Sequence, residues 1–203
     1  GPVPMWVMSA SVTASLAMLV PTISTMVNFG GTALGTWHIF QQDISYRFSL
    51  LAYFGYIGAS LWGSILAIMS LNAVVHFTNM TIAHVHLGFV GFGVPGLIAF
   101  VYFYIERSLK LKYSQNLAEW HFWLTVIGIF GYVISMGVNG WLEGSQWVAG
   151  NSPQGTMMMR YPYHVARAIS GLILLIGQLL FVWNICTTIN YSPKNTPQST
   201  IQN

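Results

Sequence analysis

Five long apolar runs dominate the sequence and restrict the folds that it can adopt. They cover about residues 6–29, 48–71, 80–105, 122–142 and 165–189. Because the hydrocarbon core of a membrane is about 30 Å thick, a helix needs about 20 such residues to cross it. Only 5% of the 203 residues are charged, whereas about a quarter are charged in soluble domains. The sequence therefore predicts an all-α integral membrane protein with about five transmembrane helices.

The polar C-terminus sets the expected domain boundary. We expect one transmembrane helical domain over residues 1–190 and a polar, disordered tail over residues 191–203. The net charge of +3 is small and dispersed, which argues against binding of nucleic acid. A single cysteine, Cys186, excludes an intrachain disulfide framework. The chain begins with GPVP rather than Met, so we expect it to be part of a longer or processed polypeptide.

The densest cluster of charges indicates how the helices are oriented. It reads ERSLKLK at residues 106–112, and by the positive-inside rule it faces the cytoplasm. Alternation of the helices then places the N-terminus, the loop around His76 and the loop at residues 147–161 outside. The tail and a loop that contains Arg47 are expected inside.

Prolines, glycines and hydroxyl side chains mark expected bends and contacts. Pro21 should kink the first span, and a turn at Pro162 should introduce the fifth. The third span carries Gly88, Gly91, Gly93, Pro95 and Gly96. So many small residues allow a partner helix or a flat cofactor to approach closely. The second span has a polar stripe of Tyr53, Tyr56, Ser60 and Ser64. The stripe either joins helices, which we favour, or carries protons through hydroxyls and waters.

Two histidines near the start of the third span, His84 and His86, are the main candidates for a functional site. Successive residues of a helix advance by about 100°, so residues two apart point to nearly opposite faces. The pair is therefore poorly placed to grip one ion, unlike the i and i+4 histidines of the H-E-x-x-H motif. Each ring could instead bind a separate large cofactor such as a haem. Alternatively, each ring donates a hydrogen bond to a neighbouring helix backbone.

Several polar residues are expected at the outer end of the helices. His76 is either a surface residue or a contact for a haem propionate. Arg167 is a charge near the outer end of the fifth span and needs an anionic partner, which could be a propionate, Glu143 or a lipid phosphate. His164 and Arg160 could play the same part from the preceding loop.

Two other features are assigned to packing. His121 is expected in an aromatic belt at the membrane interface. The run Met157, Met158 and Met159 is expected in an outer loop, as a packing or partner contact, because a soft-metal site needs spaced thioethers.

The helix with the paired histidines resembles one in the haem-copper oxidase catalytic subunits, where two histidines one residue apart bind two haems. The segment reads HFTNMTIAHVHLGFVGFG. Two later segments resemble the last two helices of the cytochrome cbb3-type (C-family) subunit I. They read LAEWHFWLTVIGIFGYVISMGVNGWLEGSQW and YPYHVARAISGLILLIGQLLFVWNI. The resemblance extends from GPVP to about Asn190, and it implies that the five helices correspond to the last five of a twelve-helix core.

The resemblance also implies roles for particular residues. His84 would be the proximal ligand of a high-spin b-type haem, where dioxygen is reduced, and His86 an axial ligand of a low-spin b-type haem. His76 would lie above the haem propionates, and Tyr56 on a helix of the proton-uptake route. The ligands of the active-site copper and the second low-spin haem ligand would come from N-terminal helices of subunit I that precede this chain.

The implied function is that of a respiratory terminal oxidase in the bacterial cytoplasmic membrane. It would reduce dioxygen to water with electrons from c-type cytochrome subunits and translocate protons. The chain departs from the resemblance at Trp62-Gly63, where many relatives have glutamate before the glycine, and at residues 78–81, where they commonly read T-D-W-T. Nitric oxide reductases share the paired histidines and replace copper with iron, so reduction of nitric oxide is an alternative function. A b-type cytochrome anchor and a cofactor-free transporter would also be consistent with histidines inside a membrane span.

Overall fold

The computed structural model describes residues 3–190, which form α-helices joined by short 3₁₀ and π-helical segments and contain no strand. In chain order the elements are α1 (Met5–Ala17), α2 (Leu19–Ala33), η1 (Trp37–Gln41), α3 (Ile44–Leu66), α4 (Met69–Val75), α5 (Asn79–His86), η2 (Leu87–Gly93), α6 (Val94–Phe103), η3 (Tyr104–Ser108), α7 (Gln115–Val148) and α8 (Met157–Asn190). The prediction of five spans is confirmed, since five stretches are long and apolar enough to cross a membrane: Met5–Ala33, Ile44–Leu66, Asn79–Ser108, Gln115–Val148 and Met157–Asn190. The tail predicted at residues 191–203 lies outside the described residues.

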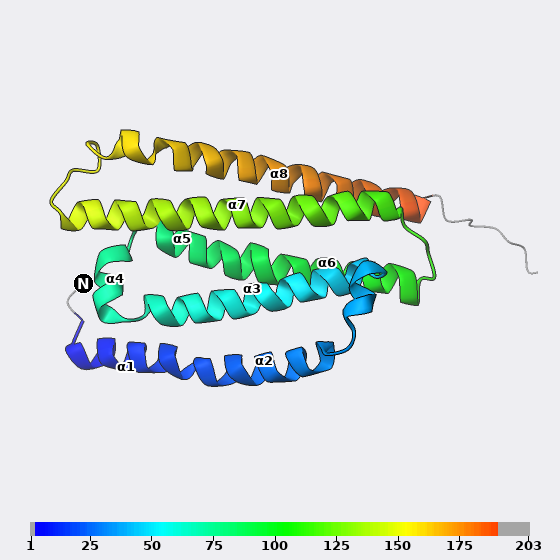
Figure 1. Cartoon of the computed structure of the whole chain (residues 1–203), viewed down its shortest axis with the longest axis horizontal. Coiled ribbons are helices and arrows are strands. Elements are labelled where there is room, and N and C mark those ends of the chain that lie inside the picture. Colours follow the sequence, from blue (N-terminus) through cyan, green and yellow to red (C-terminus); the bar gives the residue numbers. More distant parts are fainter. Residues whose placement is uncertain (1–2, 191–203) are drawn as a thin grey trace, which may run out of the picture.

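The spans lie side by side in one bundle (Figure 1). The α7/α8 pair forms one edge and α1 with α2 the other, with α3 and the span α5–η3 between them. The connections at residues 67–78 and 149–156 lie at the same end as the N-terminus, and those at 34–43 and 109–114 lie at the opposite end. This arrangement agrees with the alternation that the sequence predicts. Which end faces the cytoplasm stays a prediction.

The two prolines behave differently because they occupy different places in their helices. Pro21 has no N–H to donate to the carbonyl of Ala17, and the first span is interrupted nearby, at Met18, so the predicted kink is confirmed. The turn predicted at Pro162 is wrong, because α8 begins at Met157 and continues through the proline. A proline so close to the start of a helix removes only one hydrogen bond to a carbonyl of the first turn.

Several helix ends differ from the predicted spans. Helices α7 and α8 have 34 residues each. At a rise of about 1.5 Å per residue they are about 50 Å long, so their polar ends lie beyond the hydrocarbon core. The second span was predicted to reach residue 71, but α3 ends at Leu66. The Asn72 side chain donates to the Leu66 carbonyl at 3.0 Å, which satisfies a carbonyl at this helix end.

Small residues join α3 to the third span. A Cβ added at Gly55 would lie 2.1 Å from the carbonyl oxygen of Gly91, so the two backbones touch there. Gly88 and Gly96 continue this contact against Ala59 and Ala52. The glycine-rich face of the third span therefore packs on a partner helix, which was one of the two interpretations of this pattern.

A π-helical segment, η2, follows directly after His86. Pro95 cannot donate to the Gly91 carbonyl, and the N–H of Val94 bonds to Phe89, five residues back. This pattern inserts one residue into the helical register between the histidine pair and α6. The regular α-helix that carries the histidines is therefore only eight residues long.

Arg47 lies in a helix, and the prediction of a loop there is wrong. Helix α3 begins at Ile44 because the Asp43 carboxylate accepts hydrogen bonds from two N–H groups of its first turn. Arg47 is buried and donates to the Glu119 carboxylate at 2.5 Å and to the carbonyls of Phe40 and Gln41. The charge is tolerated there because these acceptors compensate for its burial.

His121 lies in the core instead of at an interface, so that prediction is also wrong. Its side chain is fully buried between the rings of Phe48 and Phe181, at centroid distances of 4.8 and 4.9 Å. Its Nδ1 is 3.0 Å from the Tyr102 hydroxyl. Because the Tyr102 hydroxyl on α6 is a hydrogen-bond partner for the imidazole, His121 can be buried in the core.

The polar stripe of α3 faces α1 and α2. The Tyr53 hydroxyl donates to the carbonyl of Met26 at 2.9 Å, and the Ser64 hydroxyl lies 3.3 Å from the carbonyl of Ser15. These bonds support the helix-joining interpretation. Tyr56 lines a cavity of about 450 Å³ between α2, α3 and the third span.

Candidate functional site

His84 and His86 leave α5 toward different neighbours. A Cβ added at Gly63 of α3 would lie 2.9 Å from Cε1 of His84, and the ring of Trp62 is 6.3 Å from the His84 ring. His86 instead stacks on Tyr132 of α7, with centroids 4.6 Å apart. The prediction that the two rings point to different sides of the helix is confirmed, whereas the ligands that they bind stay predictions.

The hydrogen bonds of His86 indicate which of its two ring nitrogens carries the proton. Its Nδ1 is 2.9 Å from the carbonyl oxygen of Ile82, one turn earlier in α5. A carbonyl only accepts, so Nδ1 must carry the proton and Nε2 must hold a lone pair. The Tyr132 hydroxyl lies 3.3 Å from this Nε2 and donates to it. A backbone carbonyl that orients the ring in this way is typical of metal-ligating histidines.

His84 lines a cavity on the other side of α5. The cavity has a volume of about 520 Å³ and also involves α1, Gly63, Asn72 and His76. Nδ1 of His84 is buried and has no hydrogen-bond partner within residues 3–190. The interpretation that this ring bonds to a neighbouring backbone therefore lacks support for Nδ1.

The structure brings His76 to the mouth of the same cavity. His76 is the C-terminal cap of α4, and its ring packs on Phe77 with the centroids 4.0 Å apart. Phe77 has a φ of 66° and an exposed side chain, and this left-handed residue reverses the chain between α4 and α5. His76, which was predicted as a surface residue or a propionate contact, thus lines the same cavity as His84, and its role stays a prediction.

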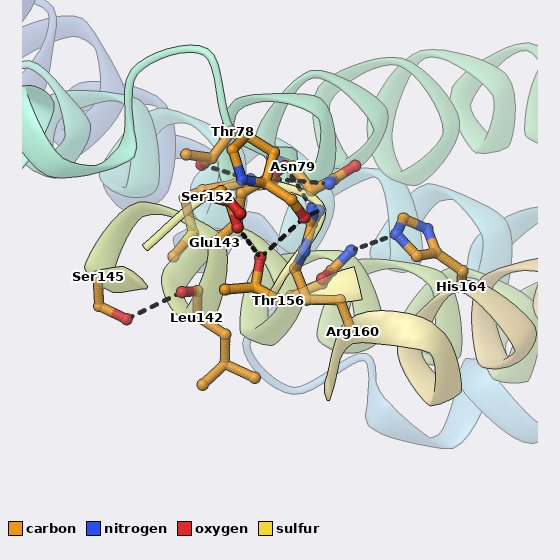
Figure 2. Close-up of polar contacts among 12 residues, drawn as sticks. Thr78, Asn79, Leu142, Glu143, Ser145, Ser152, Thr156, Arg160 and His164 are labelled. Carbon is orange, nitrogen blue, oxygen red and sulfur yellow. Dashed lines mark hydrogen bonds and ion pairs between the residues drawn. The ribbon is translucent and has the colours of Figure 1, made fainter. Parts of the chain in front are cut away.

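A polar cluster joins the start of α5 to α7 and α8 (Figure 2). Glu143 Oε2 accepts from the backbone N–H of Asn79 at 3.0 Å and from its side-chain amide at 2.8 Å. Glu143 Oε1 accepts from Arg160 at 2.5 Å. One turn deeper, the amide of Asn139 donates to Nε2 of His164 at 3.3 Å. The pairing of Arg160 with Glu143 was among the predicted alternatives, although Arg160 and His164 lie in α8 and not in the preceding loop. The contact of Glu143 with Asn79 was not predicted.

Arg167 does not contact Glu143, which was one of its three predicted partners. The carboxylate is taken by Arg160, and the Arg167 side chain is exposed and has no ion pair among the described residues. The run Met157, Met158 and Met159 forms the exposed first turn of α8 instead of a loop. A propionate or lipid phosphate stays a prediction for Arg167.

Within residues 3–190, no group of three or more His, Cys, Asp or Glu side chains is placed to hold a metal ion. The arrangement instead presents two separate imidazoles on one short helix. His84 lines the cavity of about 520 Å³, and His86 lines a small apolar cavity of about 80 Å³ between the third span, α7 and α8. An imidazole with a free Nε2, oriented by a carbonyl and packed on an aromatic ring, fits the requirements of an axial haem ligand. His86 has the orienting carbonyl and the aromatic neighbour, and its Nε2 would have to exchange the Tyr132 hydroxyl for iron. His84 lies beside the Trp62 ring and lacks the orienting carbonyl.

Comparison with known proteins gives consistent matches. A family described as cytochrome c and quinol oxidase polypeptide I matches residues 1–173. Cytochrome c oxidase subunit 1 of Rhodobacter capsulatus is 31% identical over 94% of this chain and 38% of its own length. The cbb3-type cytochrome c oxidase subunit CcoN1 of Stutzerimonas stutzeri is 32% identical over 92% of this chain and 41% of its own length.

A more distant relative, cytochrome c oxidase subunit 1 of Tetrahymena pyriformis, is 26% identical over 54% of this chain. The chain spans about two fifths of the length of the curated bacterial relatives named above. The family match, the apolar helices and the all-α bundle agree with one another. This chain is therefore a multi-pass membrane protein that belongs to the family of haem-copper oxidase subunit I.

Proposed function

We propose that this chain is the C-terminal part of the catalytic subunit of a cbb3-type respiratory oxidase. The enzyme would reduce dioxygen to water with electrons from c-type cytochrome subunits and would translocate protons. The observation that carries this proposal is the divergence of His84 and His86 from one turn of α5, each toward a different cavity. Two cofactors on opposite sides of a helix require such an arrangement.

Each histidine would hold one b-type haem, His84 the high-spin and His86 the low-spin group. When bound, the haems and a copper ion supply the electron transfer and the reduction of dioxygen. The residues of this chain orient the ligands: the Ile82 carbonyl holds the His86 ring, and Gly63 leaves room for the His84 ring. Because both ligands belong to one helical turn, the helix backbone fixes their separation.

His76 and Arg167 would act on the propionates. His76 lines the cavity of His84 near the outer end, and Arg167 is an exposed cation on α8. A cation or hydrogen-bond donor in a region of low dielectric stabilises a carboxylate strongly. We therefore assign both residues to the anionic edge of the haems.

The remaining ligands would come from N-terminal helices of subunit I, because the relatives are more than twice as long as this chain. Those helices would cover α1, α2 and α8, which expose many large apolar side chains and are the least buried spans. The complex would lie in the bacterial cytoplasmic membrane, with the N-terminus of this chain outside and the cluster at residues 106–112 inside.

Spectroscopy of the purified complex tests the haem assignment. A reduced-minus-oxidised spectrum should show low-spin and high-spin b-type haems, and carbon monoxide should shift only the high-spin bands. His84→Ala should abolish the carbon monoxide signal, whereas His86→Ala should remove the low-spin bands. Variants that both retain both signals would refute the assignment, and a wild-type complex without haem would refute the enzyme proposals together.

Nitric oxide reduction is the second candidate function, and the Trp62 ring beside His84 is the observation that favours it. In the resemblance on which the oxidase proposal rests, a glutamate commonly precedes the glycine at this position. Metal analysis separates the two candidates: copper supports the oxidase, and non-haem iron in place of copper supports nitric oxide reduction. Haem without any binding of carbon monoxide would leave only an electron-transferring anchor.

A further inference from the structure

We propose that Glu143 is a positioning residue for His86, because its carboxylate fastens the first turn of α5 to α7 and α8. This inference rests on the proposed function, in which His86 binds an iron. Glu143 lies on α7, eleven residues after Tyr132. It contacts the start of α5, whereas the two histidines lie at the end of that helix.

The carboxylate of Glu143 is fully engaged by two neighbouring helices. Oε2 accepts two hydrogen bonds from Asn79, the first residue of α5, and Oε1 accepts one from Arg160 of α8 (Figure 2). Glu143, Asn79 and Arg160 are each at most 9% exposed. Charge-assisted hydrogen bonds of this kind are shorter and stronger than neutral ones, and burial shields them from water and salt.

The backbones touch at the same place, so the carboxylate needs no long reach. A Cβ added at Gly140 would lie 1.9 Å from the backbone nitrogen of Met80. A Cβ added at Gly144 would lie 2.1 Å from the carbonyl oxygen of Val74. Residues 140–144 of α7, which read GWLEG, thus lie in close backbone contact with the α4–α5 connection, and Glu143 lies between the two glycines.

The fastened turn is linked rigidly to His86. Asn79, Ala83 and His86 recur at helical spacing and share one face of α5. All three face α7 or are buried, since Asn79 bonds to Glu143, Ala83 has no exposed surface and His86 stacks on Tyr132. His84 lies on another face, against α3.

The other end of this short helix continues into a segment that packs on α3, where a Cβ added at Gly55 would lie 2.1 Å from the Gly91 carbonyl oxygen. After His86 the chain enters the π-helical segment η2, where the register changes by one residue. Contact with α3 thus holds the far end, whereas the Glu143 carboxylate fastens the start of α5 to α7. Loss of the clamp should move His86 relative to Tyr132 and leave the contact of His84 with α3 in place.

The test compares variants in the complete purified complex. Glu143→Ala removes the contacts with both Asn79 and Arg160. Glu143→Gln keeps a carbonyl oxygen that can accept from Asn79. Asn79→Ala removes the side-chain bond to Glu143 and keeps the bond from the backbone N–H of residue 79. Glu119→Ala is the matched control, because Glu119 accepts from Arg47 at the other end of the bundle. The readouts are the electron paramagnetic resonance signal of the low-spin ferric haem and the carbon monoxide difference spectrum of the high-spin haem.

We expect Glu143→Ala to shift or broaden the low-spin signal and to lower the ratio of low-spin to high-spin haem at least twofold. Asn79→Ala should give a smaller shift in the same direction, Glu143→Gln should restore most of the signal, and Glu119→Ala should match wild type. An unchanged low-spin signal in Glu143→Ala, or equal changes in both haems, would overturn the positioning role. If Glu143→Ala does not assemble, Asn79→Ala decides by the same two criteria.

The outcome also separates this inference from the proposed function. If His86→Ala removes the low-spin signal while Glu143→Ala leaves it intact, the haem assignment stands and only the positioning role fails. If His86→Ala leaves the low-spin signal unchanged, the haem assignment itself fails.

Discussion

Replacement of Gly55 by alanine should separate α3 from the third span. The added Cβ would lie 2.1 Å from the Gly91 carbonyl oxygen, which is 1.3 Å short of an ordinary contact of 3.4 Å. The obstacle is backbone, so no side chain can swing away. Overpacking of this kind costs about 1–3 kcal/mol, and the better helix propensity of alanine returns up to about 1 kcal/mol. We expect a net destabilisation of about 1–2 kcal/mol.

Gly31→Ala in α2 is the matched control, because a Cβ there meets no atom of residues 3–190 within 4 Å. This variant should gain about 0.5–1 kcal/mol from helix propensity alone. The two variants should therefore differ by about 1.5–3 kcal/mol, which corresponds to about 3–12 °C in thermal unfolding of a chain of this size. Scanning fluorimetry of the purified complex measures the difference. Equal melting temperatures would show that the helices are not in backbone contact at Gly55.

Two further predictions concern buried polar groups. Arg160→Ala leaves the Glu143 carboxylate buried with one partner fewer and should destabilise the complex by about 3–5 kcal/mol. The double variant Arg160→Ala with Glu143→Gln should recover part of this loss in thermal unfolding. No recovery would contradict the role of the ion pair. Burial raises the pKa of the Tyr113 hydroxyl above its ordinary value, and nearby Glu106 adds to this effect. The protonated hydroxyl therefore stabilises the fold below the unfolded pKa of about 10, and this contribution is lost as the pH rises through the folded pKa. The melting temperature should fall less between about pH 9 and about pH 11 in Tyr113→Phe than in wild type, and identical slopes would refute the assignment.

The spans and the direction of the histidines were predictable because both depend on local sequence. A run of about 20 apolar residues must cross the membrane as a helix, since only a helix satisfies its backbone there. The i and i+2 spacing of His84 and His86 turns them to different sides of any helix. The kink near Pro21 follows equally from one missing N–H.

Helix ends and buried polar residues were not predictable in the same way. His121 is predicted at an interface by its flanking tryptophans, yet Tyr102 on α6 draws it into the core. Arg47 is predicted in a loop because it precedes the second apolar run, yet it lies in α3, where Glu119 on α7 compensates for its charge. In both cases the polar partner that allows burial lies on another helix, so the local sequence does not predict it.

Periodicity and hydrophobicity specify which face of each helix is apolar, and they specify that His84 and His86 diverge. They do not specify which helices meet, because that depends on where backbones can approach. Glu143 meets Asn79, 64 residues away, only because Gly140 and Gly144 let α7 touch the start of α5. The separate surroundings of the two histidines are likewise a property of the packed bundle, in which α3 lies on one side of α5 and α7 on the other.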